Sequence, residues 1–132
     1  MKEYNEDTAK KGIKAKLPKI KCWPNQYRNY EIKITIPEFT SVCPKTSLPD
    51  FGKIEIRYMP DKFCIELKSL KYYILGYRNL GIFYENAVNK ILNDIKEASK
   101  PKWVVVEGKF NSRGGMITEV LASYGKIPPT RD

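Results

Sequence analysis

The chain has 132 residues, the length of one domain with a modest core. It is 42% hydrophobic and 30% charged, and no apolar run approaches the roughly 20 residues of a membrane span, so we expect no membrane association. Lys and Arg number 24 against 15 Asp and Glu, and this net charge of +9 suits a phosphate-bearing partner such as a nucleic acid or a phosphorylated cofactor. Histidine is absent, which excludes His-based zinc sites, Ser-His-Asp triads and Cys-His dyads.

The cysteines and the N-terminus indicate a location. The chain has three cysteines, an odd number with no CxxC pair, which fits a reducing compartment better than a disulfide framework. The first residues are charged and contain no hydrophobic signal core. We therefore expect a cytoplasmic protein. Residues 1–21 hold seven Lys and three acidic residues, so residues 1–29 are predicted to form a basic tail and lead-in.

Two segments alternate in the manner of half-solvated strands. In 30–36 and in 53–58, an apolar residue occupies every second position and polar residues fill the others. Such alternation is typical of antiparallel sheets with one solvated face. The stretch between them, 39–52, is predicted to be a stiff irregular loop. Regular pairing is denied to it by Pro37, Pro44 and Pro49, which lack the N–H that a strand ladder requires.

The middle of the chain predicts two helices. After a short extended piece over 63–67, Ser69 is expected to cap a helix that runs to about Tyr77. A second helix is predicted over 83–98, before Pro101, because apolar residues recur there every three or four positions. These positions are Phe83, Ala87, Val88, Ile91, Leu92 and Ile95.

The C-terminal part predicts a second hairpin, with strands over 102–110 and 116–123 and a glycine-containing turn between them. The predicted order is β-β-α-α-β-β, an α+β fold in which two helices cover one face of a four-stranded antiparallel sheet. We expect one domain over 30–126 and a C-terminal tail over 127–132. The outer edges of so small a sheet are unpaired, so a homo-oligomer is expected.

Two side chains around the predicted loop are candidates for catalysis. Cysteine is the strongest nucleophile among the side chains near neutral pH, and Asp50, seven residues after Cys43, can supply or remove a proton. A thiol has a pKa of about 8.5, so its activation needs a base or a nearby positive charge, for which Lys45 is the local candidate. On residue types alone, a small buried cysteine and a turn-forming aspartate are the preferred interpretation.

The strand-to-helix junction near residue 66 has the residue types of a phosphate site. Lys68, Ser69 and Lys71 place two cations and a hydroxyl at a predicted helix N-terminus, where anions are stabilised. A solvated first turn would give the same pattern. Glu66 fits an exposed strand position, and Glu85, in the first turn of the second helix, is favoured there by the helix dipole in any case.

Several stretches of the chain occur together in the order of one known family. They are Cys43–Thr46, Pro49–Phe51, Tyr58–Lys62, Glu66–Tyr73, Tyr77–Asn79, Glu85 and Phe110–Gly115. Over residues 30–125 the chain resembles the QueF nitrile reductases, the NADPH-dependent 7-cyano-7-deazaguanine reductases of queuosine biosynthesis. The most specific stretch is the one that begins at Glu66. The resemblance implies the tunnelling fold, with single-domain subunits assembled into a barrel of stacked rings, a decamer, and active sites between subunits.

The resemblance also implies a role for each candidate. Cys43 would add to the nitrile carbon to give a thioimide, and Asp50 would be the proton donor, with a pKa raised by burial. NADPH would supply the hydrides, and no metal would be needed. The residues implied for the 7-deazaguanine substrate are Ile65, Glu66, Leu67, Tyr84 and Glu85, and those implied for NADPH are Lys68, Ser69 and Lys71. Tyr84 departs from the family, which usually has His there, and tyrosine does not titrate near neutral pH.

Two other functions are open at this point. QueF-like amidinotransferases use the same cysteine on the nitrile base within tRNA and add ammonia, and that branch is expected to lack the NADPH signature that is complete here. A basic RNA-binding module would explain the net charge of +9 but none of the motifs. We expect a small-molecule substrate and no stable nucleic-acid partner.

Overall fold

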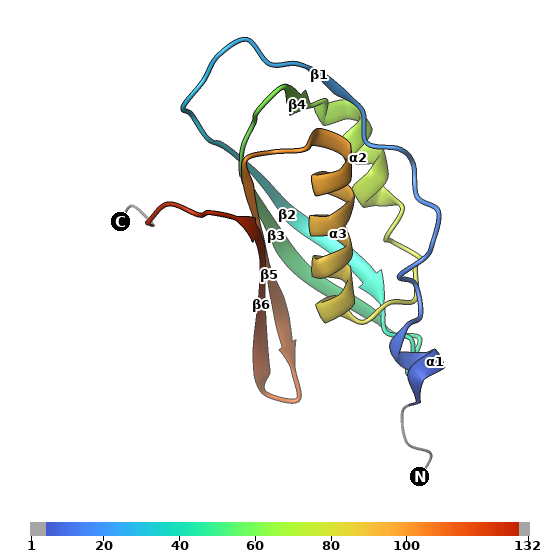
Figure 1. The fold of residues 1–132 in the computed structure, drawn as a ribbon. Helices are drawn as coiled ribbons and strands as arrows, with labels where there is room; N and C mark the ends of the chain where they lie inside the picture. The colour runs from blue at the N-terminus through green and yellow to red at the C-terminus, as the bar shows by residue number, and fades with distance from the viewer. Residues whose placement is uncertain (1–4, 130–132) are drawn as a thin grey trace.

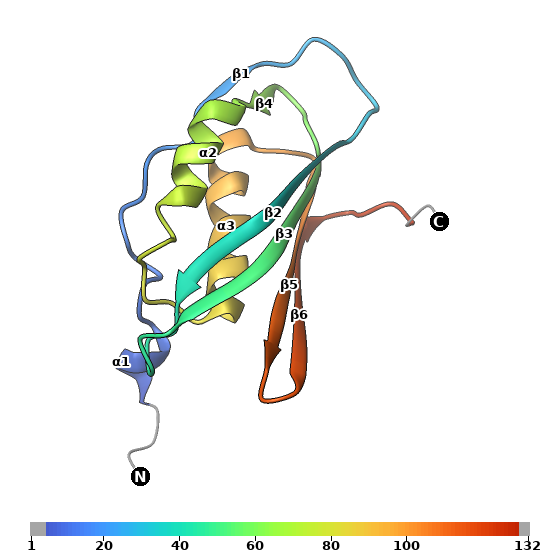
Figure 2. The ribbon, with the colours of Figure 1, turned by 180° about the vertical axis from the view of Figure 1, so that it is seen from behind.

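Four antiparallel strands form the main sheet of the protein, whose computed structural model describes residues 5–129. In order across the sheet they are β2 (Ile32–Val42), β3 (Pro49–Met59), β5 (Trp103–Arg113) and β6 (Met116–Gly125). Figure 1 shows two helices on one face of this sheet, and Figure 2 shows the other face, which no helix covers. The predicted fold class is therefore confirmed. The outermost parts of the two predicted tails, 1–4 and 130–132, lie outside the described residues.

The two helices are α2 (Leu67–Leu75) and α3 (Tyr84–Ser99). Five of the six apolar positions predicted for the second helix are buried in α3, which confirms the helical spacing, whereas Phe83 is the half-buried N-cap of the helix. The predicted cap of the first helix is wrong, because Glu66 is its N-cap and Ser69 lies one turn further on. A carboxylate at that position accepts the N–H groups that the first turn leaves without intrahelical partners.

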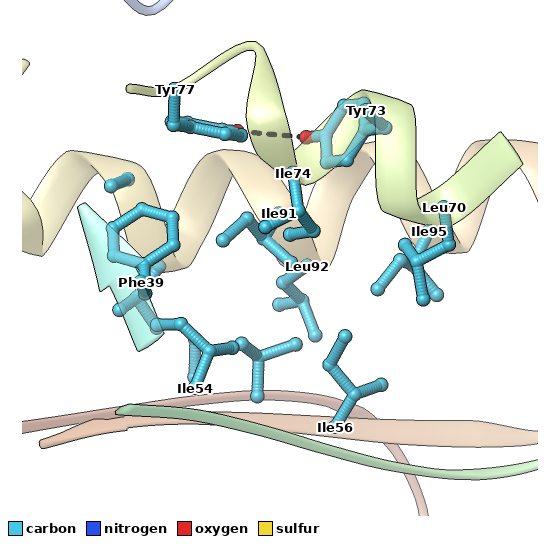
Figure 3. Close-up of a cluster of buried hydrophobic side chains, with 14 of the residues drawn as sticks. Phe39, Ile54, Ile56, Leu70, Tyr73, Ile74, Tyr77, Ile91, Leu92 and Ile95 are labelled. Atoms are coloured by element: carbon cyan, nitrogen blue, oxygen red, sulfur yellow. Dashed lines mark hydrogen bonds between the residues drawn. The ribbon is translucent and has the colours of Figure 1, made fainter. Parts of the chain in front are cut away.

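The core lies between the helices and the sheet (Figure 3). Side chains of β2 and β3 meet side chains of both helices there, and all of them are at most 8% exposed. A fully buried Ile or Leu contributes about 1.5–3 kcal/mol, so this layer holds the helices on the sheet. The labelled members are Phe39, Ile54, Ile56, Leu70, Tyr73, Ile74, Tyr77, Ile91, Leu92 and Ile95.

The predicted irregular loop over 39–52 is wrong for most of its length. Both strands extend into it, and only residues 43–48 connect them. Pro37 lies in a β-bulge of the edge strand β2, and Pro49 is the first residue of β3. A bulge, an edge and a strand start are the positions where the missing N–H of proline is tolerated, so these prolines do not prevent pairing.

The uncovered face of the sheet carries ion pairs. The guanidinium of Arg57 lies 2.9 Å from the carboxylate of Glu31, and the ammonium of Lys33 lies 3.6 Å from the carboxylate of Glu55. Hydrogen bonding to Glu31 raises the pKa of Arg57. This face is therefore polar, in contrast to the apolar face under the helices.

The described part of the N-terminal lead-in is structured. It contains the short helix α1 (Glu6–Ala9) and the strand β1 (Cys22–Pro24), which the sequence did not predict. β1 pairs with β4 (Phe63–Ile65) in a separate two-stranded sheet. None of the helices in the described part of the chain combines the length and apolar character needed to cross a membrane.

Candidate active site

The register of β2 and β3 brings Cys43 and Asp50 to the same end of the sheet. Asp50 pairs directly with Ser41, and the Cys43 N–H donates to the Leu48 carbonyl at 2.9 Å, which continues the ladder into the connection. Alternate residues of a strand face the same side, so Cys43 and Asp50 are diagonal neighbours on the helix face. Diagonal neighbours of this kind lie about 7–8 Å apart. The sequence-predicted thiol and carboxyl are therefore brought together.

This region, which we call the cysteine end (Ser41, Cys43, Asp50 and Tyr84), places polar groups where the core would otherwise be apolar. Asp50 is 4% exposed and Ser41 is 0% exposed, whereas Cys43 is half-buried. The Ser41 hydroxyl makes no hydrogen bond within the described residues. Buried hydroxyls without a partner are uncommon in cores that serve stability alone, so this end of the sheet favours a site for a polar ligand.

The backbone around Cys43 is held from two sides. The Val42 N–H donates to the Leu80 carbonyl at 3.0 Å, and the Ile82 N–H donates to the Val42 carbonyl at 2.9 Å. On the other side, the Ser47 N–H donates to the Cys43 carbonyl at 2.9 Å. The thiol therefore projects from backbone that is fixed by hydrogen bonds on both flanks.

The first residue of α3 covers the same end. The ring of Tyr84 stacks on the ring of Phe110, with centroids 4.3 Å apart and planes at 18°, and its hydroxyl donates to the Thr118 hydroxyl at 3.4 Å. Two glycines make room for this stack. A Cβ at Gly52 would lie 2.8 Å from the Phe110 ring, and a Cβ at Gly108 would lie 2.7 Å from it. Glycine allows this close approach of ring and backbone.

Glu85 follows Tyr84 in the first turn of α3 and is exposed. Its side chain is therefore at the surface beside the cysteine end, where it can accept hydrogen bonds from a ligand. The backbone carbonyl of Glu85 accepts a hydrogen bond from the Asn89 amide at 2.8 Å, which is a contact within the helix.

The remaining predicted site residues lie at the opposite end of the sheet, which we call the α2 end (Ile65–Lys71). The Ile65 N–H donates to the Tyr58 hydroxyl at 2.9 Å, and burial raises the pKa of Tyr58 to about 12. Tyr58 is eight residues from Asp50 along β3, or roughly 26 Å at about 3.3 Å per residue. Ile65 is buried, whereas Leu67 is 62% exposed. Within one protomer, the α2 end does not meet Cys43.

At the α2 end, two lysines are exposed, whereas the polar side chains of Glu66 and Ser69 form hydrogen bonds within the protein. The Glu66 carboxylate accepts the N–H groups of Lys68 and Ser69. The Ser69 hydroxyl accepts the Lys21 N–H at 2.8 Å and donates to the Glu66 carbonyl at 2.8 Å. Lys68 and Lys71 are exposed. Two exposed ammonium groups near the start of a helix fit the phosphates of a dinucleotide, so the residues present are compatible with NADPH.

The sequence analysis missed Ser41 and the glycines around Phe110. Ser41 precedes Cys43 by two residues, so strand alternation would have placed both on one face once residues 37–42 were assigned to a strand. The glycine spacing carries no comparable signal, because Gly52 and Gly108 lie on different strands and come together only through the register of β3 and β5.

Comparisons with known proteins define first the class and then the family. The crystal structure of the archaeosine synthase QueF-Like in the apo form superposes with a TM-score of 0.71, covering 77% of this chain and 100% of that chain at 24% sequence identity. The protein therefore has the tunnelling fold. The family profile described as "QueF-like protein" matches residues 49–129, and the chain belongs to the QueF family.

Two curated relatives are more similar in sequence. A protein of Elusimicrobium minutum is 60% identical over 93% of this chain and 94% of its own length. A protein of Chloroherpeton thalassium is 57% identical over 80% of this chain and 92% of its own length. Both are named NADPH-dependent 7-cyano-7-deazaguanine reductase.

Proposed function

We propose that the chain is an NADPH-dependent oxidoreductase that reduces the nitrile of 7-cyano-7-deazaguanine to 7-aminomethyl-7-deazaguanine, in queuosine biosynthesis. The observation that carries the proposal is the diagonal pairing of Cys43 with the buried Asp50 on one face of the sheet. The names of relatives that are 57–60% identical over most of the chain support the substrate and the cofactor.

The chemistry follows from these two side chains. The Cys43 sulfur adds to the nitrile carbon, a C–S bond forms, and the nitrile nitrogen takes a proton from Asp50 to give a thioimide. NADPH, when bound, supplies the two hydrides that the four-electron reduction of a nitrile to an amine requires. Between the two reductions the C–S bond breaks and Cys43 leaves as a thiolate, while a second proton completes the amine. Covalent capture divides one difficult reduction into easier steps.

The binding residues are assigned in two groups. At the cysteine end, Tyr84 and Glu85 hold the N–H edge of the deazaguanine. At the α2 end, Lys68 and Lys71 bind the NADPH phosphates, and the Ser69 hydroxyl fixes the turn that presents them. The segment Ile65–Leu67 contributes to the wall of the base pocket.

Because these two groups lie at opposite ends of one protomer, a second protomer completes the site. The α2 end of one subunit approaches the cysteine end of its neighbour, in a homo-oligomer of stacked rings, a decamer. β2 and β6 are the edge strands of the sheet, and their free ladder positions support edge-to-edge assembly. The chemistry needs a reduced thiol, which suits the cytoplasm, and needs no stable nucleic-acid partner.

The test follows NADPH absorbance with 7-cyano-7-deazaguanine. The parent is expected to consume two NADPH per amine formed and Cys43→Ala none. Cys22→Ala is the matched control, because Cys22 is a half-buried thiol on β1 whose sulfur donates to the Ala98 carbonyl at 3.5 Å. It should keep the parent rate.

Intact-protein mass spectrometry supplies the second arm of this test. With substrate and no NADPH, the parent mass should increase by one substrate and the mass of Cys43→Ala should not. An unmodified parent mass at saturating substrate would overturn the proposal. Release of an amidine on addition of ammonia, without NADPH oxidation, would favour the amidinotransferase instead.

A further inference from the structure

The described part of the lead-in runs along the helical side of the molecule, from α1, beside the end of β2, to β1 near the other end (Figure 1, Figure 2). It contacts both halves of the candidate site. The Lys21 N–H bonds to Ser69 at the α2 end, and the turn around Gly12 lies against Gly81 and Ile82, close to the cysteine end.

The contact at Gly12 is backbone on backbone. Gly12 has φ +83°, and a Cβ there would lie 2.6 Å from the Gly81 carbonyl oxygen and 2.7 Å from Cβ of Ile82. Only glycine combines this left-handed conformation with so close an approach. The turn at Gly12 therefore rests directly on the segment 80–82.

The opposite side of segment 80–82 holds the backbone next to the thiol. Leu80 and Ile82 exchange backbone hydrogen bonds with Val42, at 3.0 and 2.9 Å. Beyond Val42, Cα of Pro44 lies 3.9 Å from the position that a Cβ of Gly81 would take. The segment therefore touches the residues immediately before and after Cys43.

Side chains of α3 fasten the same turn. The Asn86 amide donates to the Ala9 carbonyl at 2.6 Å, and the Lys90 ammonium donates to the Ile13 carbonyl at 2.8 Å. The Lys90 side chain is only 10% exposed, so it is committed to this contact and to its ion pair with Asp94. These bonds tie the turn to the helix that begins with Tyr84.

We propose that the Gly12 turn is a positioning element of the active site. By backing segment 80–82 it fixes the backbone from Val42 to Pro44, and with it the direction of the Cys43 thiol toward Asp50. The effect on turnover rests on the proposed function, whereas the effect on the thiol does not. Displacement of a reacting group by about 1 Å can cost about 100-fold in rate, so a small shift of this turn is measurable.

The test compares Gly12→Ala with Gly115→Ala. Gly115 has φ +81°, almost the same as Gly12, but an added Cβ there meets nothing within 4 Å, so the control carries the same backbone strain without the clash. The readouts are the pH profile of Cys43 alkylation by iodoacetamide, followed on the Cys43 peptide by mass spectrometry, and kcat and KM for the nitrile. Gly12→Ala should change the alkylation rate of Cys43 at least about threefold. It should also lower kcat about tenfold with little change in KM. Gly115→Ala should match the parent in all three quantities.

Gly12→Ala tests positioning only if it folds, so Lys90→Met is measured beside it. Lys90→Met removes the hydrogen bond to the Ile13 carbonyl. It should change the Cys43 alkylation rate and kcat in the same direction as Gly12→Ala does, each by about threefold. Parent-like alkylation of Cys43 in both variants, or equal changes in Gly115→Ala, would overturn the positioning role even if the Tm falls. If the parent reduces no nitrile, the alkylation arm still decides this inference, and only the proposed function fails.

Discussion

The two ends of the sheet use their polar side chains in opposite ways. At the cysteine end, the carboxyl of Asp50 and the hydroxyl of Ser41 are buried across from each other, and the register of β2 and β3 places both near the thiol. At the α2 end, Lys68 and Lys71 are exposed on a helix that is capped from within. Under the proposed function, one chain supplies both the thiol and the acid, whereas the two cations form an exposed surface that the cofactor would contact.

The difference between the two ends is tested most directly by substituting Asp50 and Ser41, which pair across β2 and β3 at the cysteine end. Asp50→Asn keeps the shape and removes the proton donor, so kcat should fall about 100-fold or more. Ser41→Ala is the matched control, because Ser41 is equally buried and its hydroxyl makes no hydrogen bond in the described part of the chain. It should retain stability, and its activity should fall much less than that of Asp50→Asn. Steady-state kinetics and thermal unfolding of both variants check this, and equal losses of activity would contradict it.

The α2 end is tested by its cations. Lys68→Met and Lys71→Met should each raise the KM for NADPH about tenfold, because a hydrogen bond to a charged group contributes about 1.5–3 kcal/mol. kcat at saturating NADPH should change little. Lys62→Met is the control, since Lys62 is an exposed lysine outside the helix. Initial rates against NADPH and NADH measure the effect; an unchanged preference between the two cofactors would speak against contact with the 2′-phosphate, and an unchanged KM for both would speak against phosphate binding here.

Between the two ends, buried hydroxyls join α2 to α3 (Figure 3). The Tyr77 hydroxyl lies 2.8 Å from that of Tyr73, which donates to the Asp94 carboxylate. Burial raises the pKa of both tyrosines in the folded state. Above about pH 10 the unfolded chain therefore loses these protons first, and the free energy of unfolding should fall by about 1.4 kcal/mol per pH unit for each tyrosine.

Urea unfolding from about pH 9 to pH 11 measures this slope. Tyr73→Phe should reduce the slope by the contribution of one tyrosine, about 1.4 kcal/mol per pH unit. Tyr27→Phe, at a position that is 78% exposed, should leave it unchanged. If both variants keep the slope of the parent, Tyr73 is excluded as a source of the pH dependence.

The smallest expected effect concerns Tyr84, the position at which the family resemblance implies His. Tyr84→His places an imidazole with an ordinary pKa of about 6.5 on the Phe110 ring, so kcat should gain a pH dependence near that value, of about threefold. Tyr84→Phe keeps the stack without a titrating group and should show no such step. The measurement is kcat against pH for the three proteins, and identical profiles would mean that this position does not take part in proton delivery.

The spacing of apolar residues in the sequence correctly predicted those helices and strands that bury one face. The spacing of Val88, Ile91 and Ile95 located α3 to within one residue at each end, because a helix that buries one stripe must repeat it. The strand ends were misplaced because proline was judged as an interior residue, whereas Pro37 lies in a bulge and Pro49 begins a strand. The helix cap was misplaced because Glu66 was not considered as an N-cap.

The candidate site was predictable only in part. Residue types and the family resemblance identified Cys43 and Asp50 as candidates, and the structure brings them together. The resemblance could not show that Ser41 faces Asp50 or that Gly12 backs the segment beside the thiol. Both contacts depend on which residues of distant segments meet, and a single sequence does not contain that information.

The bulge in β2 has one more consequence. Two residues separate Ile36 from Phe39, while one residue separates their partners Ile54 and Gly52 on β3. Side chains alternate along a strand, so this extra residue exchanges the positions that point inward. In a strand of the same length without the bulge, plain alternation would turn Val42 toward α3 and the Cys43 sulfur toward the uncovered face. The bulge therefore decides whether the Cys43 thiol and the Asp50 carboxyl share one face of the sheet.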